Sequence, residues 1–277
     1  MNVRAVLAAA IARLGGGDAH LDAQLLLAHV LGKSRAWLFA WPEHELDAAQ
    51  RATFERMVAA RERGEPVAYL TGHREFWSLD LVVTPDVLIP RHETESLVEL
   101  ALADIPEDRD VRIADLGTGS GALALVLARE RPRAHVLATD ASTAALAVAR
   151  DNARRLDIRN VTFAEGDWCE ALGRERFDLI VSNPPYIAAH DPHLDIGDVR
   201  HEPKSALIAG VDGLDAIRRI VADANAHLRS GARLLIEHGW DQAERVRALF
   251  MAAGYVHVGS ARDAAGHERV TFGVRPG

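Results

Sequence analysis

The residues most suggestive of chemistry are Asn183, Pro184, Pro185 and Tyr186, which follow the apolar run Phe177–Val181. The run predicts a buried strand, and the prolines end it because proline fixes φ and donates no ladder hydrogen bond. Open α/β sheets place their ligands at such strand ends. Asn183 Oδ1 and the Pro184 carbonyl can each accept one hydrogen of a substrate –NH2 group, while Tyr186 can pack against its plane. The tetrapeptide also suits a plain strand terminator, since asparagine and proline are ordinary turn residues.

A second motif lies upstream, where the predicted strand Arg112–Leu116 runs into a glycine-rich loop. The residues expected to bind a cofactor here are Asp115, Gly117, Thr118, Gly119, Ser120 and Gly121. Glycines let the backbone approach a ligand closely, and free N–H groups at the start of helix Ala122–Arg129 would meet its polar groups. Asp115 at the strand end would attract the ammonium group of an amino acid and repel a pyrophosphate.

Two further strand ends complete a predicted nucleoside site. The strand Val136–Thr139 ends at Asp140, which is placed to accept hydrogen bonds from two ribose hydroxyls. The strand Val161–Ala164 leads to Asp167 and Trp168, where the carboxylate could accept from an exocyclic amine and the indole could stack on a base. Ligand sites after three successive βα units predict a doubly wound sheet.

Two kinds of cofactor, a dinucleotide and S-adenosylmethionine, are bound by folds with a glycine loop of this kind. Gly117-x-Gly119-x-x-Ala122, with Asp140 downstream, also satisfies a loose dinucleotide fingerprint. Asp115 disfavours a pyrophosphate, however, and Asn183 would have no role in hydride transfer. S-adenosylmethionine, which combines adenosine with a zwitterionic amino acid, suits these residues better and leaves S-adenosylhomocysteine as product. Asn183 is expected to border this cofactor as well as the substrate.

Composition and charge limit the classes of protein to consider. The 277 residues are 48% hydrophobic and 26% charged, as in soluble globular proteins. One cysteine, no secretory signal and no run of ~18 apolar residues lead us to expect a cytoplasmic protein with no membrane segment. Residues 1–72 carry eight basic and eight acidic side chains, so the net charge of −8 lies in residues 73–277. Such an acidic region predicts no broad surface for nucleic acid.

The remaining pattern predicts a helical start and a polar loop. Helices are expected at Val3–Leu14, from Asp18 or Asp22 to Gly32, at Arg35–Phe39, from Asp47 to near Gly64, at Thr94–Ile105, at Gly213–Leu228 and at Asp241–Ala253. Arg74–Val83 predicts a hairpin turning across Ser78–Asp80. Residues 187–210 read as a mobile substrate-covering loop, and the histidines 190, 193 and 201 in it have no recognised metal-ligand spacing, so no metal is expected.

Together these stretches resemble the release-factor glutamine methyltransferase family over essentially the whole chain. The matching stretches are Gly64–Pro66, Leu70–Gly72, Arg74–Trp77, Leu88–Arg91, Asp115–Gly121, Asn183–Tyr186, Glu202–Pro203, Glu237–Gly239 and Glu268–Thr271. One departure is His92, where the family usually has proline. The resemblance implies transfer of a methyl group from S-adenosylmethionine to the side-chain nitrogen (N5) of the glutamine in the Gly-Gly-Gln motif of class-1 peptide chain release factors.

The resemblance also implies an architecture. We expect an α/β, Rossmann-like class I methyltransferase sheet, closed by a C-terminal antiparallel hairpin of Tyr255–Gly259 and Arg269–Val274, beside a small N-terminal helical domain. Residues 1–72 would form the substrate-recognition domain, 73–90 a β-hairpin linker and 91–277 the methyltransferase domain. The enzyme is expected to act as a monomer on the release factor, with Asn183, Pro184 and Tyr186 as its catalytic residues.

Two other classes remain open from the sequence. A DNA adenine or other base N-methyltransferase could use the same Asn183 loop, since adenine also carries an amine on a planar ring, although it would normally bring a basic binding surface. A binding module that retains the fold without catalysis is the second alternative. It is disfavoured because the glycine loop and the Asn183 loop are both intact.

Overall fold

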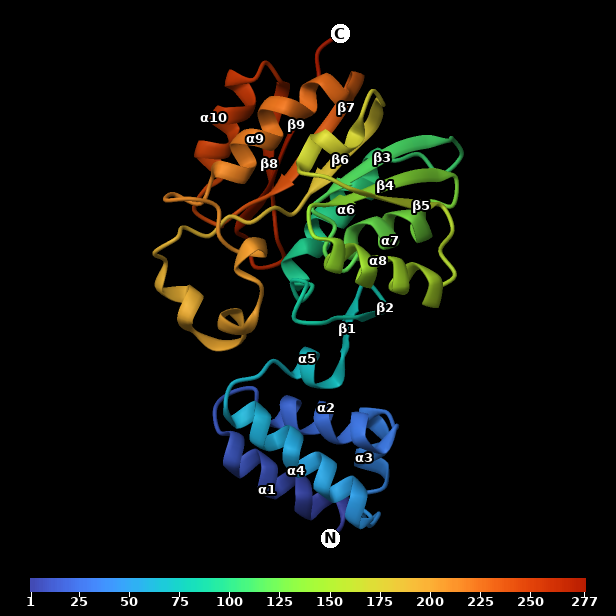
Figure 1. Cartoon of the computed structure of the whole chain (residues 1–277), viewed down its shortest axis with the longest axis vertical. Coiled ribbons are helices and arrows are strands. Elements are labelled where there is room, and N and C mark those ends of the chain that lie inside the picture. The colour runs from blue at the N-terminus through green and yellow to red at the C-terminus, as the bar shows by residue number, and fades with distance from the viewer. The chain divides into compact units, whose positions relative to one another are not determined.

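The computed structural model describes all 277 residues, and the chain forms two compact units. The smaller unit contains residues 1–73 and 195–201, and the larger contains residues 74–194 and 202–277. Figure 1 traces the chain from the blue helices of the smaller unit to the red strands of the larger one. Every helix is too short or too polar to cross a lipid bilayer.

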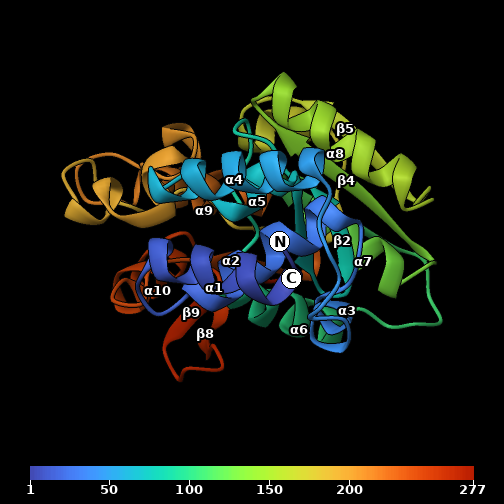
Figure 2. The same cartoon turned by 90° about the horizontal axis from the view of Figure 1, so that it is seen from below.

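The smaller unit is a bundle of short helices. These are α1 (Val3–Leu14), α2 (Ala19–Leu31), α3 (Arg35–Ala40), α4 (Ala48–Glu62) and α5 (Val67–Thr71). Helices α1, α2 and α4 lie side by side and bury an apolar core that includes Leu26 and Phe54 (Figure 2). Asp47 starts α4 with a capping box: its Oδ1 accepts from Gln50 N at 2.7 Å, and Gln50 Oε1 accepts from Asp47 N at 3.0 Å.

The segment 195–201 belongs to this helical unit although it lies within the long loop predicted at 187–210. Arg61 on α4 holds it, donating to Asp22 Oδ2 at 2.7 Å and to Asp198 Oδ1 at 2.5 Å. Asp18 is the residue before α2, but its side chain makes no capping hydrogen bond. Asp22 is not the cap either, because it lies inside the first turn of α2, where its backbone N–H donates to the Asp18 carbonyl at 2.9 Å.

The larger unit is built on one sheet of seven strands. These are β3 (Val111–Leu116), β4 (Ala134–Asp140), β5 (Val161–Glu165), β6 (Phe177–Ser182), β7 (Leu228–Glu237), β8 (Val256–Arg262) and β9 (Glu268–Val274), in the order β5-β4-β3-β6-β7-β9-β8. The first five pair in parallel, and β9 runs antiparallel to both β7 and β8. The predicted Rossmann-like sheet with a C-terminal antiparallel hairpin is therefore confirmed.

Helices cover both faces of the sheet, as a parallel sheet requires. They are α6 (Glu95–Asp104), α7 (Ala122–Glu130), α8 (Thr143–Arg155), α9 (Asp215–Ala224) and α10 (Ala243–Ala252). Successive side chains of β6 alternate between two cores: Leu179 and Val181 pack with α6 and α7, and Ile180 packs with α9 and α10. Figure 1 shows α9 and α10 together beside β6 to β9.

The predicted hairpin forms from β1 (His73–Phe76) and β2 (Leu79–Val82), but its turn is earlier than expected. Trp77 and Ser78 occupy the turn with φ of 49° and 59°, and Asp80 lies within β2. A type I′ hairpin turn has positive φ at both central residues and favours asparagine, aspartate and glycine there, so tryptophan and serine did not predict this position. Phe76 and Leu79 bury in the core that α6 and α7 share.

Candidate active site

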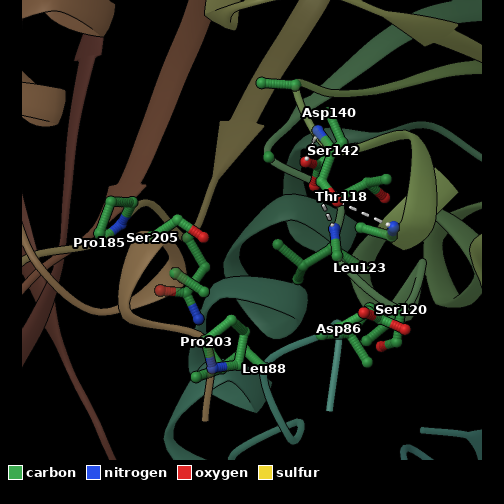
Figure 3. Close-up of a pocket in the computed structure, with 18 of the residues that line it drawn as sticks. Asp86, Leu88, Thr118, Ser120, Leu123, Asp140, Ser142, Pro185, Pro203 and Ser205 are labelled. Atoms are coloured by element: carbon green, nitrogen blue, oxygen red, sulfur yellow. Dashed lines mark hydrogen bonds between the residues drawn. The ribbon is translucent and has the colours of Figure 1, made fainter. Parts of the chain in front are cut away.

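A cavity of about 330 Å³ lies at the carboxyl ends of the central strands. Strand β3 pairs with β4 on one side and β6 on the other, so the cavity lies where the direction of strand order reverses. It is lined by residues 86–88, 90, 94, 117–120, 122, 123, 140–142, 145, 166–168, 183, 185, 203, 205 and 206. Figure 3 shows Asp140, Ser142 and Thr118 together on one side, and Pro185, Ser205 and Pro203 on another.

Asp140, at the end of β4, is held by two backbone groups. Its Oδ2 accepts from Gly119 N at 2.9 Å, and its Oδ1 accepts from Ser142 N at 2.9 Å. A carboxylate has about four lone-pair sites, so each oxygen can still accept one hydrogen bond from a ligand. Asp140 thus joins the glycine loop to α8 and presents two acceptors to the cavity, as a ribose diol requires.

Backbone hydrogen bonds join the glycine loop to the end of β4. Gly117 N and Thr118 N both donate to the Thr139 carbonyl at 2.9 Å, and Gly121 N donates to the Thr118 carbonyl at 2.8 Å. The loop therefore satisfies these three N–H groups internally, and the expected ligand contacts stay with the N–H groups at the start of α7. Gly117, Thr118, Gly119 and Ser120 line the cavity, and Gly121 does not.

Glycine is required at position 117 by the backbone conformation and by the nearby Trp168 ring. Gly117 has a φ of 74°, and a Cβ at this position would lie 3.1 Å from the Trp168 ring. A side chain would therefore displace the indole as well as strain the backbone. Trp168 lines the cavity next to Asp167, whose carboxylate also forms an ion pair with Arg219.

Asp115 lies beneath the glycine loop and does not line the cavity. It is fully buried, and its Oδ2 accepts from the Thr118 hydroxyl at 2.6 Å. Oδ1 has no hydrogen-bond partner. Burial raises the pKa of Asp115 to about 7, against the lowering effect of hydrogen bonds from Thr118 and from the Ala124 backbone.

Asn183 and Pro185 line the cavity, while Pro184 and Tyr186 do not. The Asn183 side chain donates from Nδ2 to Thr94 Oγ1 at 3.0 Å, which leaves Oδ1 for another donor. The Pro184 carbonyl accepts no hydrogen bond from the protein. Gln242 donates from Nε2 to the Tyr186 carbonyl at 2.9 Å, so the loop is fixed at both ends.

Residues that the sequence did not single out hold this site together. Asn152 on α8 is fully buried, donates to the carbonyls of Val82 and Ser120 at 2.9 Å, and accepts from Val82 N at 2.7 Å. It therefore ties the hairpin to the glycine loop. A polar residue on the buried face of an amphipathic helix was the only signal in the sequence.

Glu202, from one of the stretches that carry the family resemblance, also holds the site together and lies next to the cavity-lining Pro203. Glu202 is buried, accepts from Ile89 N at 3.2 Å and forms an ion pair with Arg91. It thereby joins two of the stretches that carry the family resemblance. His92 follows in a short 3-10 turn, 3.4 Å from Glu95 Oε1 and exposed, so the absence of proline there is accommodated.

The loop histidines do not gather around a common point. No three His, Cys, Asp or Glu residues in the structure are arranged to hold a metal ion. His193 contacts Asp191 at 2.7 Å, and His201 accepts from Arg200 at 3.1 Å. Both lie outside the cavity.

The residues present fit S-adenosylmethionine. The cavity volume lies within the range of small-molecule sites. Asp140 offers acceptors suited to a diol, Trp168 offers an aromatic face, and Leu88 and Leu123 supply apolar walls. The lining carries no lysine or arginine, which a pyrophosphate would favour.

Known proteins share both the sequence and the fold. Residues 4–72 match the family described as PrmC N-terminal domain, and residues 92–199 match the family described as Methyltransferase small domain. A release factor glutamine methyltransferase from Xylella fastidiosa is 54% identical over 99% of this chain and 98% of its own length. The release factor glutamine methyltransferase from Escherichia coli is 48% identical over 91% of each chain. This chain belongs to the release factor glutamine methyltransferase family.

Solved structures agree with this membership at the level of the fold. A methyltransferase from Pyrococcus furiosus has a TM-score of 0.55 and 16% identity, and the alignment covers 83% of this chain and 100% of that one. The T. thermophilus 16S rRNA N2 G1207 methyltransferase, solved with AdoMet and guanosine, has a TM-score of 0.55 and 21% identity over 73% of this chain and 49% of that one.

Membership in the release factor glutamine methyltransferase family confirms the resemblance seen in the sequence. The chain is an S-adenosylmethionine-dependent methyltransferase, and the dinucleotide interpretation of its glycine loop is excluded.

Proposed function

We propose that this enzyme methylates the side-chain nitrogen of the glutamine in the Gly-Gly-Gln motif of class-1 peptide chain release factors. The observation that carries the proposal is the Asn183 side chain, which lines the cavity while its Nδ2 is committed to Thr94. Its Oδ1 is left as an acceptor at the place where a substrate –NH2 group would meet the cofactor. High identity to release factor glutamine methyltransferases over the full chain supports the choice of substrate.

The chemistry that these residues must support is a direct displacement. A glutamine nitrogen is a poor nucleophile because its lone pair is delocalised into the carbonyl. Hydrogen bonds from its –NH2 group to Asn183 Oδ1 and the Pro184 carbonyl favour a pyramidal nitrogen and hold it in line for attack. These contacts strengthen as positive charge develops on nitrogen, so they stabilise the transition state more than the bound substrate. The bound cofactor supplies a methyl group on a sulfonium centre.

The cofactor contacts follow from the same cavity. Asp140 would accept from the ribose hydroxyls, Trp168 would pack against the adenine, and Asp167 would accept from the exocyclic amine. After transfer the nitrogen is acidic enough to lose a proton to solvent, so no strong general base is needed.

We also propose that the helical unit recognises the body of the release factor. Its side chains make no part of the cavity, and it exposes Phe39 and Trp41 by 66% and 59%. The enzyme would act as a monomer in the cytoplasm without direct contact to nucleic acid. The acidic balance of residues 73–277 supports the last point.

The test uses the full chain with methyl-labelled S-adenosylmethionine and three acceptors. These are an intact class-1 release factor, the same factor with asparagine in place of the Gly-Gly-Gln glutamine, and duplex DNA. We expect one methyl group per intact factor and none on the other two. Labelling of DNA, or equal labelling of the asparagine-bearing factor, would refute the proposed substrate.

A further inference from the structure

Trp240 is an exposed aromatic residue at the same edge of the sheet as the Asn183 loop. It follows the end of β7 and is 63% exposed, although tryptophan is on average a well-buried residue type. Strand β7 pairs in parallel with β6, with Ile236 opposite Ser182, so both strands end at this edge. Trp240 does not line the cofactor cavity. The indole therefore serves neither the core nor the cofactor.

The backbone that carries Trp240 is fixed to the Asn183 loop. Gln242, which is 7% exposed, bridges the two segments. Its Nε2 donates to the Tyr186 carbonyl at 2.9 Å, and its Oε1 accepts from Gly239 N at 2.9 Å. Trp240 thus keeps a constant place beside the loop that would bind the substrate nitrogen.

The Trp240 ring also has a neighbour in the turn between β8 and β9. Its centroid lies 6.2 Å from that of the His267 ring, with the two planes tilted by 57°. Asp263 holds this turn, since its Oδ1 accepts from His267 N at 2.9 Å and its Oδ2 accepts from Arg269 Nε at 3.2 Å. An indole supported in this way loses little conformational freedom when a partner covers it.

We propose that Trp240 packs against the two glycines that precede the target glutamine in the release factor. This inference rests on the proposed function and names a contact beside the methylated side chain. Glycine has no Cβ, so a Gly-Gly segment leaves the faces of its peptide planes uncovered. A flat indole can cover such a face, whereas larger residues would hold the backbone away from the ring. Trp240 would thereby select for glycine next to the glutamine.

The place of Trp240 favours the substrate over a second copy of this chain. The target glutamine must reach Asn183, so the residues beside it cross the sheet edge on which Trp240 lies. Met251 and Val256 are also exposed, by 60% and 41%, but they lie near the end of α10 and at the start of β8, where the parallel strands begin. These side chains therefore form no continuous apolar patch with Trp240, as a dimer interface would need.

The first test measures kcat/KM on a short Gly-Gly-Gln peptide and on an intact release factor. Trp240→Ala should lower kcat/KM about tenfold for both acceptors, as expected for loss of an anchoring indole, with kcat and S-adenosylmethionine affinity unchanged. Trp240→Phe keeps a flat ring and should recover most of the loss. The matched control is Trp41→Ala, which removes a similarly exposed indole from the helical unit and should leave turnover of the peptide unchanged.

The second test changes the substrate together with the enzyme. Gly-Gly-Gln and Ala-Ala-Gln peptides are compared on the wild type and on Trp240→Ala. The two added methyl groups should lower kcat/KM about tenfold on the wild type and much less on the variant, because the ring that they obstruct is gone. A purely structural role of Trp240 would give the same loss on both enzymes.

The outcomes separate this inference from the proposed function. Wild-type enzyme that methylates neither acceptor would overturn both. If the wild type is active, unchanged kcat/KM in folded Trp240→Ala would overturn the glycine contact alone, as would an equal loss from Ala-Ala-Gln on both enzymes. Sedimentation tests the second copy: self-association of the wild type that Trp240→Ala abolishes, with unchanged turnover of the peptide, would assign Trp240 to a dimer interface and also overturn the contact.

Discussion

Asp140 shows how a single side chain can serve both the loop and the ligand. Its two oxygens each accept one backbone N–H, from Gly119 and Ser142, and each keeps capacity for a second bond. Asp140→Ala should therefore weaken S-adenosylmethionine binding by about 1–3 kcal/mol, since hydrogen bonds to a charged acceptor are lost. Isothermal calorimetry measures this directly. Asp178→Ala, in the same sheet but outside the cavity, should bind normally; unchanged affinity in a folded Asp140→Ala protein would remove Asp140 from the site.

The raised pKa of Asp115 makes the stability of the protein depend on pH. Its pKa is about 7 in the folded protein, against about 3.9 in an unfolded chain. Between these values the folded state holds a proton that the unfolded state has lost. Asp115 therefore stabilises the folded state most below pH 4. As the pH rises from 4 to 7, its contribution to the free energy of unfolding falls by up to about 1.4 kcal/mol per pH unit.

Asp115→Asn should remove that dependence, because asparagine accepts from Thr118 but does not titrate. Urea unfolding at pH 5 and pH 8 gives the comparison. The variant should lose less stability between the two values than the wild type loses. An equal loss in both proteins would show that Asp115 is ionised throughout.

At the scale of elements, two arginines tie the segment 195–201 to the end of α4: Arg61, which binds Asp198, and Arg200, whose Nη2 donates to the Arg63 carbonyl at 2.6 Å. Arg61 binds Asp22 and Asp198, and its side chain is only 20% exposed. Arg61→Gln should cost on the order of 1–2 kcal/mol, less than a fully buried pair, and should release the segment. Hydrogen exchange should then speed up in residues 195–201. Arg159→Gln, whose ion pair is exposed, should change neither quantity; unaltered exchange in Arg61→Gln would show that other contacts hold the segment.

The elements also show which features a sequence can predict. Helix α1 has the predicted bounds and Asp47 caps α4, because both depend on neighbours a few residues away. The contact of Asn183 with Thr94 joins residues 89 apart, and that of Val82 with Asn152 joins residues 70 apart. Hydrophobic spacing predicts which face is buried but not which buried polar groups meet. The lining residues 117–120, 140, 167, 168, 183 and 185 were predicted because each follows a strand, and strand ends share one edge of a parallel sheet.

At the scale of the whole molecule, recognition of a protein substrate needs surface beyond the cavity. Trp41 and Phe39 are exposed aromatic residues of the helical unit, a residue type enriched in interfaces. Replacing both with serine should raise KM for an intact release factor by about tenfold, which corresponds to about 1.4 kcal/mol. Methylation of a short Gly-Gly-Gln peptide should not change. Met251→Ser, 60% exposed on the larger unit, is the matched control; equal KM values in all three proteins would place recognition elsewhere.

The most direct test of the account is the single-turnover rate of Asn183→Ala on an intact release factor. The fold and most of the cofactor affinity should persist, because Asn183 contributes one hydrogen bond to the structure. The rate should fall by about 10²–10³, as expected for the loss of one preorganised polar contact. Asn183→Asp keeps an acceptor of nearly the same shape and should retain measurable activity. Thermal melting and calorimetry on the same preparations separate a catalytic loss from an unfolded protein. A near-normal rate in stable Asn183→Ala would contradict the mechanism.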